Sequence, residues 1–170
     1  MLDKKIVDLL NSQINREFYS SYLYLDMSNY YYDANLNGFG NWFGIQTQEE
    51  YAHAMLFLQY MQNNGHRPVL DTIAKPDITF NSFKHALEEA YKHELYISQS
   101  INDIYAVAYE VKDFRTMQFL DWFVKEQGEE EKNVDELCKR FDLFGVDPRG
   151  LYMIDTELAA RTFTAPSLVL

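Results

Sequence analysis

The chain has 170 residues and a formal net charge of −11, and 47% of its residues are hydrophobic. This length and apolar content suit one domain with a single core and argue against a disordered chain. The acidic balance argues against a nucleic-acid partner, because nucleic acids select basic surfaces. The single cysteine, Cys138, excludes an intramolecular disulfide and fits a reducing compartment.

The first eight residues contain two aspartates and no long apolar run. We therefore expect neither a signal peptide nor a membrane span. Together with the cysteine usage, this predicts a cytoplasmic protein without a membrane partner.

Apolar and aromatic residues recur at helical spacing in four long segments, which predicts four long helices. The expected ranges are about 4–33, 39–64, 81–111 and 114–144. Asn35-Leu36-Asn37-Gly38 has the composition of a turn, in which the Asn-Gly pair tolerates positive φ. Asn81 or Ser82 is expected to cap the third helix.

Asp147-Pro148 has the composition of a helix start, with proline at the first helical position. A shorter fifth helix is expected there, and its apolar face is too short to stabilise one bundle by much: Leu151, Ile154 and Leu158. We expect residues 1–145 to form the bundle, 146–161 to add the fifth helix to the same domain, and 162–170 to be a loose tail.

The connection lengths predict the topology. Short connections after the first and third helices favour antiparallel hairpins, whereas residues 65–80 contain Pro68 and Pro76 and have no helical period. Sixteen extended residues reach about 53 Å, which exceeds the length of about 39 Å of a 26-residue helix. The prediction is an all-α, up-down-down-up four-helix bundle with a long crossover between the second and third helices and a short fifth helix.

Glu50 and His53 lie three residues apart in the second expected helix, so their side chains share one face. The Glu-x-x-His motif recurs in four-helix bundles that bind paired iron or manganese ions. Glu17 and Glu50 are equidistant from the first turn, and Glu94 and Gln127 are equidistant from the second. Each pair is 33 residues apart, and the second pair follows the first by 77 residues. All four side chains interrupt apolar stripes at one expected layer of the core.

Burying an ionised carboxylate costs several kcal/mol unless it is paired or coordinated. The expected layer holds four carboxylates, Glu17, Glu50, Glu94 and Glu130, and no lysine or arginine falls on those stripes at that level. Two divalent metal ions would balance the charge, and His53 would add a nitrogen ligand. An oxygen-rich site with one imidazole and no thiolate suits iron.

Residues beside this layer leave alternatives open. Glu49, Glu126 and Glu129 form either a third metal site or an acidic surface run. Tyr24 is either a redox-active phenol beside the metals or a core tyrosine, and Trp122 has the same ambiguity. The remaining histidines fit no ligand spacing and are expected at the surface: His66, His85 and His93.

Over almost its whole length the chain resembles the prokaryotic non-haem ferritins. The residues that carry the resemblance are Glu17, Tyr24, Glu50-Tyr51-Ala52-His53, Glu94, Trp122 and Glu126-Gln127-Gly128-Glu129-Glu130. The resemblance implies that Glu17, Glu50 and His53 form the first iron site of a ferroxidase centre, with Glu50 bridging. Glu94 and Glu130 would complete the second site with Gln127 close by. Glu49, Glu126 and Glu129 would form the third.

The resemblance also implies a cage of 24 subunits that oxidises Fe(II) with dioxygen or peroxide and stores a ferric oxo-hydroxide mineral. The fifth helix would pack at a four-fold axis of the cage. Ala52 lies where bacterioferritins place a haem-ligating methionine, so haem is not expected. The rival functions are a di-iron oxidase or peroxidase that keeps its metals, and a silent cage subunit. The absence of a second Glu-x-x-His counts against the first, and the full ligand set against the second.

Overall fold

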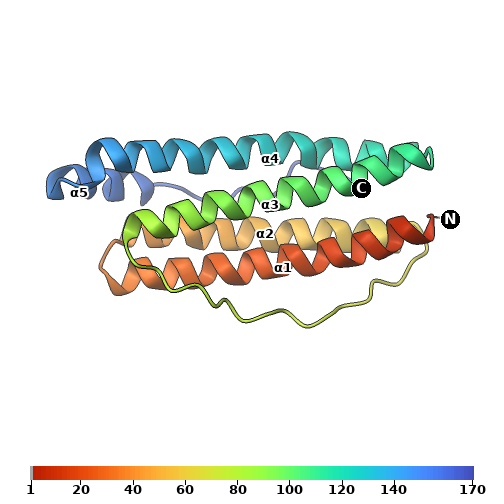
Figure 1. Cartoon of the computed structure of the whole chain (residues 1–170), viewed down its shortest axis with the longest axis horizontal. Coiled ribbons are helices and arrows are strands. Elements are labelled where there is room, and N and C mark those ends of the chain that lie inside the picture. The colour runs from red at the N-terminus through yellow and green to blue at the C-terminus, as the bar shows by residue number, and fades with distance from the viewer. Residues whose placement is uncertain (1) are drawn as a thin grey trace.

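The structure is a computed structural model that describes residues 2–170, and its regular elements are all helical. The long helices lie side by side, and the short last helix lies at one end of the bundle (Figure 1). The elements are α1 (Lys4–Asp33), α2 (Asn37–Asn63), α3 (Phe83–Glu110), α4 (Phe114–Arg140), a π-helical turn (Phe141–Gly145) and α5 (Pro148–Leu158). The predicted all-α bundle with a fifth helix is confirmed.

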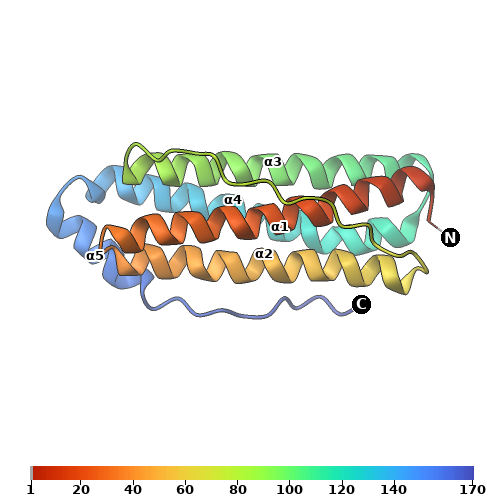
Figure 2. The same ribbon diagram turned by 90° about the horizontal axis from the view of Figure 1, so that it is seen from below.

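The crossover between α2 and α3, residues 64–82, runs back along the full length of the bundle (Figures 1 and 2). Two asparagines of α1 hold it. The Val69 backbone N–H donates to Asn11 Oδ1 at 2.8 Å, and Asn15 Nδ2 donates to the Thr72 carbonyl at 3.0 Å. The crossover makes α2 and α3 run in the same direction, as the predicted up-down-down-up topology requires.

Side-chain caps fix where the helices begin. Ser82 accepts a hydrogen bond from the His85 backbone N–H at the start of α3, as the sequence predicts. Asp147 caps α5, and Pro148 occupies its first turn. The first interhelical turn differs from the prediction, because positive φ falls on Asn35, at 59°, and not on the Asn-Gly pair.

The start of α2 depends on α5. Asp155 Oδ1 accepts hydrogen bonds from the backbone N–H groups of Gly38, at 2.7 Å, and Phe39, at 3.0 Å. These groups have no partner within their own helix, so Asp155 acts as a cap supplied from far along the chain. A Cβ atom at position 38 would lie 1.6 Å from the Asp155 carbonyl oxygen. A glycine at position 38 therefore allows α5 to approach α2 closely, and it is not needed for a turn with positive φ.

The fifth helix packs against the bundle of its own chain, which corrects the expectation that its apolar face adds little to one bundle. Ile154 and Leu158 are buried in a cluster that includes Phe39 and Phe141. The tail forms no regular element, and its looseness stays a prediction. Residues 162–170 run back along α2 (Figure 2), and Trp122 Nε1 donates to Ser167 Oγ at 3.1 Å.

The buried apolar side chains form two clusters. One lies toward the α5 end of the bundle and includes Leu23 and Phe43. The other lies toward the opposite end and includes Ile14 and Phe57. Glu17 and Glu50 fall between these clusters along α1 and α2, so the polar layer interrupts the core at mid-length. Within residues 2–170, no helix is both long and apolar enough to cross a membrane.

The contact between α5 and α2 predicts a large effect of one methyl group. We expect Gly38→Ala to destabilise the protein by about 1–3 kcal/mol, since the added Cβ must push the Asp155 backbone away. Gly128→Ala is the matched control, because nothing lies within 4 Å of a Cβ at that helical position. It should instead stabilise by about 0.5–1 kcal/mol. Denaturant unfolding of the two variants tests this, and equal midpoints would contradict it.

Candidate metal centre

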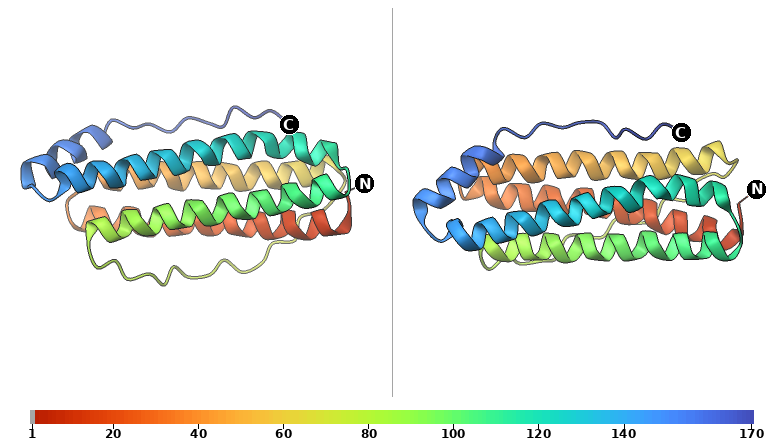
Figure 3. Two further views of the ribbon diagram at one scale, coloured as in Figure 1. Left: turned by 45° about the horizontal axis from the view of Figure 1, so that its top comes forward. Right: turned by 90° about the horizontal axis from the view of Figure 1, so that it is seen from above.

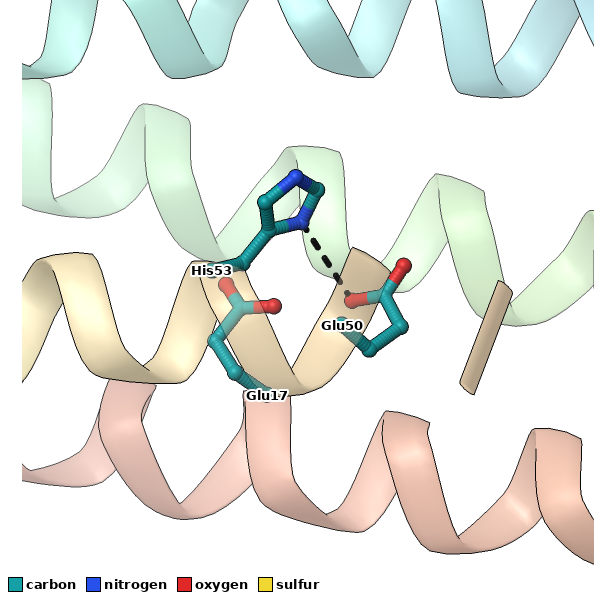
Figure 4. A group of neighbouring side chains, drawn as sticks. All are labelled: Glu17, Glu50 and His53. Carbon is teal, nitrogen blue, oxygen red and sulfur yellow. Dashed lines mark ion pairs between the residues drawn. The ribbon is translucent and has the colours of Figure 1, made fainter. Parts of the chain in front are cut away.

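Three buried side chains from α1 and α2 converge between the helices (Figure 4). Glu17, Glu50 and His53 each offer one ligand atom, and these atoms lie within 4.8 Å of one another. The Nδ1 atom of His53 lies 3.6 Å from Glu50 Oε2. The three residues are 1%, 1% and 2% exposed. One small cation could contact all three.

Several oxygens of this cluster lack a hydrogen-bond donor among the described residues. They are Glu17 Oε2 and both carboxylate oxygens of Glu50. Buried polar atoms almost always have a partner, and leaving one without a partner costs about 1–3 kcal/mol. The chemistry of a carboxylate pair beside an imidazole fits a divalent cation such as iron.

Two glutamine side chains donate hydrogen bonds to carboxylates of this layer, one to Glu17 and one to Glu130, which lies outside the three-residue cluster. Gln13 Nε2 donates to Glu17 Oε1 at 2.6 Å, and Gln13 is itself fixed by Ser100 Oγ at 2.6 Å. Gln46 Nε2 donates to Glu130 Oε2 at 2.8 Å. Outer contacts of this kind orient ligands and tune a bound metal.

A second group lies on α3 and α4 and shares the layer. Glu94 accepts hydrogen bonds from the Tyr24 hydroxyl and from Gln127 Nε2, the latter at 3.0 Å. Glu94, Gln127 and Glu130 are 1%, 3% and 4% exposed. They lie outside the three-residue cluster, and amides or hydroxyls occupy oxygens of both carboxylates.

Burial and mutual repulsion keep protons on this layer. Desolvation, followed by the negative charge of Glu130, raises the pKa of Glu94 to about 8. Desolvation also raises the pKa of Glu17 and of Glu50 well above their usual range, and neighbouring carboxylates add to the effect. A cation entering the layer must therefore displace protons.

The three glutamates beside the layer differ in their surroundings. Glu49 is 18% exposed and pairs with Arg161, whose Nη2 atom lies 2.6 Å from Glu49 Oε2. Glu126 is half-buried, whereas Glu129 is exposed. The Trp122 ring lies edge-on to the His53 ring at 5.6 Å.

Sequence analysis did not predict the residues that donate hydrogen bonds to the glutamates of the layer and to Glu49. Gln13 and Gln46 precede Glu17 and Glu50 by four residues, so a polar residue one helical turn before each candidate ligand was the available signal. No signal pointed to Arg161, because its partner lies 112 residues away. The expectation that His93 lies at the surface is wrong. It is half-buried, and its Nε2 atom lies 2.7 Å from Ser20 Oγ.

Several known proteins are similar to this chain. A family model described as a ferritin-like domain matches residues 7–144. The chain is 35% identical over 158 residues to a probable bacterial non-heme ferritin-like protein of Haemophilus influenzae, covering 93% of this chain and 96% of that one. It is 36% identical over 155 residues to the bacterial non-heme ferritin of Campylobacter jejuni, covering 91% and 93%.

Solved structures are also similar to this chain. An Archaeoglobus fulgidus ferritin engineered into a closed form superposes with a TM-score of 0.94 and 38% identity, over 96% of this chain and 100% of that one. An open pore ferritin from the same archaeon superposes with a TM-score of 0.93 and 38% identity, over 95% and 100%.

The raised pKa values predict how the stability of the metal-free protein depends on pH. Below about pH 4.5 the carboxyl groups of Glu17, Glu50 and Glu94 are protonated in both the folded and the unfolded state. As pH rises, the unfolded chain loses these protons first, and each pKa unit of difference lowers stability by about 1.4 kcal/mol. The melting temperature should therefore fall between about pH 5 and pH 8, where Glu94 titrates.

Differential scanning calorimetry in the presence of a chelator tests this prediction. Glu94→Gln should have a shallower decline, because the amide does not titrate. Saturating Zn(II) should also reduce the decline. A melting temperature that rises over this range, or an unchanged slope in the variant, would contradict the assignment of buried protons.

Proposed function

We propose that this chain, which belongs to the ferritin family, is an iron-storage protein that oxidises Fe(II) at a centre built on Glu17, Glu50 and His53. The observation that carries the proposal is the group of buried carboxylate oxygens that have no donor but face an imidazole. Fe(II) is the substrate, and ferric oxo-hydroxide is the stored product.

The chemistry follows from the ligand set. Glu17, Glu50 and His53 would hold one Fe(II), and Glu94 with Glu130 would hold a second, with Gln127 beside it. Neither carboxylate oxygen of Glu50 has a hydrogen-bond donor within residues 2–170, so this residue is suited to bridge two ions. Anionic ligands stabilise Fe(III) more than Fe(II), which favours the transfer of one electron from each ion to dioxygen or peroxide.

Storage requires the oxidised product to leave the centre. Gln127 places an uncharged amide where a second histidine or carboxylate would hold the ferric product more firmly. It already donates to Glu94 and cannot serve as an anionic ligand. This feature favours a storage protein over a di-iron oxidase that retains its metals.

Tyr24 is well placed to assist at the second site. Its hydroxyl donates to Glu94, and burial together with that carboxylate raises the pKa of the phenol. The phenol therefore stays protonated and is the group that we propose as an additional electron donor. Glu49, Glu126 and Glu129 would form a third iron site next to the centre.

A closed cage of 24 copies in the cytoplasm would hold the product. Large apolar side chains near α5 remain exposed in the single chain: Val146 at 85%, Tyr152 at 72% and Met153 at 62%. Exposed apolar surface of this kind marks protein interfaces, and a symmetric assembly of identical chains buries it repeatedly. We propose that this surface contributes to the cage.

The proposal predicts that loss of one ligand abolishes rapid oxidation. Substitutions in the outer shell of metal sites typically cost 10–100-fold, so Glu50→Ala and His53→Ala should slow Fe(II) oxidation by more than about 100-fold. Stopped-flow absorbance after adding two Fe(II) per subunit to the metal-free protein measures the rate. Glu136→Ala, which removes an exposed glutamate of α4, is the control. Parental rates in both ligand variants would refute the centre.

The assembly surface has a test that is independent of the chemistry. Replacing Tyr152 and Met153 together by aspartate should shift the protein toward small species in analytical ultracentrifugation, since the charges cannot be buried. The conservative pair Tyr152→Phe and Met153→Leu should assemble normally. Initial oxidation per subunit should stay near the parental rate in both. An intact particle with the two aspartates would contradict the proposed surface.

A further inference from the structure

Arg161 lies just beyond α5 and reaches back to α2, where it makes three contacts. Its Nη2 atom donates to Glu49 Oε2 at 2.6 Å, and its Nη1 atom donates to the Trp42 carbonyl oxygen at 3.3 Å. The guanidinium also lies over the Trp42 ring, 4.7 Å from its centroid. The side chain is 22% exposed, so this ion pair is largely shielded from solvent.

The chain on both sides of Arg161 is also held to the bundle. We call residues 159–170 the C-terminal strap. Asn41 Nδ2 donates to the Arg161 carbonyl at 3.0 Å, and Trp122 Nε1 donates to Ser167 Oγ. Leu168 packs against the apolar cluster that contains Phe57. Figures 2 and 3 show the strap running back beside α2.

Glu49 is a carboxylate that needs a cation. It adjoins Glu50 in sequence, and the negative charges of Glu130 and Glu126 act on it. A guanidinium is planar and donates to carboxylates in a fixed geometry, so Arg161 satisfies this need from within the chain. Sequence analysis left Glu49 as either a ligand of a third metal ion or part of an acidic surface run, and in the structure this carboxylate pairs with Arg161.

We propose that Arg161 is the resident counter-ion of Glu49 and that a cation binds the third site only by displacing Arg161 and releasing the strap. The proposal rests on the proposed function, because it concerns the third site of that centre. One guanidinium leaves as one divalent cation enters. The strap and the third cation therefore exclude each other, and by linkage each weakens the binding of the other to the same degree.

This arrangement would order the filling of the sites. The inner carboxylates of Glu17 and Glu50 have no arginine or lysine partner within residues 2–170, so an entering cation displaces protons there but no cationic side chain. Glu49 would accept a cation only after the competing guanidinium has moved. Arg161 is in this sense a positioning residue for the third site and does not touch the inner centre.

Equilibrium titration with Zn(II), which is redox-inert, tests the competition without any oxidation. In Arg161→Gln the third equivalent per subunit should bind at least tenfold more tightly than in the parental protein, while the first two are unchanged. Arg161→Lys keeps the charge and should remain closer to the parental affinity. Arg140→Gln is the matched control, because this arginine pairs with Glu157 outside the centre. It should leave all three affinities unchanged.

Hydrogen exchange supplies a readout that a merely structural arginine would not give. In the parental protein, the third equivalent of Zn(II) should increase amide exchange in residues 159–170, whereas the first two should not. Glu49→Gln should remove both the third equivalent and this effect. Tryptophan fluorescence gives a second signal, since Trp42 and Trp122 are the two tryptophans of the chain and both contact the strap.

The outcomes separate the two proposals. If fewer than two equivalents bind to the parental protein, the proposed function fails. If two bind but the third is unchanged or weakened in Arg161→Gln, only the competition is overturned. A strap whose exchange is unaffected by the third equivalent would overturn it as well.

Discussion

The burial of four carboxylates and an imidazole in one layer of the bundle is the constraint on which the rest of the structure depends. Each isolated ionised carboxylate there would cost several kcal/mol, so the layer must hold protons or cations. The apolar clusters on either side supply the stability that allows this cost. They also bury Glu17 and Glu50, which are each 1% exposed, and within residues 2–170 no donor reaches Glu17 Oε2 or either carboxylate oxygen of Glu50. The apolar packing that stabilises the bundle therefore also buries carboxylate oxygens that have no donor within residues 2–170.

Neutral amide side chains donate hydrogen bonds to the buried carboxylates without neutralising their charge. Gln13 and Gln46 each donate one hydrogen bond to a carboxylate and bring no charge of their own. A lysine or arginine in either place would have formed a buried ion pair and removed the need for an external cation. The amide instead fixes one oxygen of Glu17 and leaves the other free for a ligand. Preorganisation of this kind requires a residue that donates a hydrogen bond to the carboxylate but does not neutralise its charge.

The sequence predicted the features that follow from local periodicity. The range 4–33 of the first helix matches α1, and the bundle topology followed from two short connections and one long crossover. The layer followed from the symmetry of antiparallel hairpins, since residues equidistant from a turn lie at one level. The features that were not predicted depend on contacts between distant segments. Asp155 caps α2 from 116 or 117 residues away, and no pattern around Gly38 reveals that partner. The sequence also predicted one continuous fourth helix over residues 114–144, whereas α4 ends at Arg140 and is followed by the π-helical turn at Phe141–Gly145.

Glu49 and Glu50 show how one residue step along a helix changes the chemistry of a carboxylate. Successive helical residues point in directions about 100° apart, so Glu50 faces the interior, where it is 1% exposed, and Glu49 faces the edge, where it is 18% exposed. Within residues 2–170 no lysine or arginine pairs with Glu50 in the interior, whereas Glu49 at the edge pairs with Arg161, which follows α5. Desolvation still raises the pKa of Glu49 to about 7 despite its arginine partner, so the edge position is intermediate between core and solvent. The fold thus gives neighbouring carboxylates different surroundings: Glu50 is buried and has no cationic side chain as a partner within residues 2–170, and Glu49 pairs with the chain's own guanidinium.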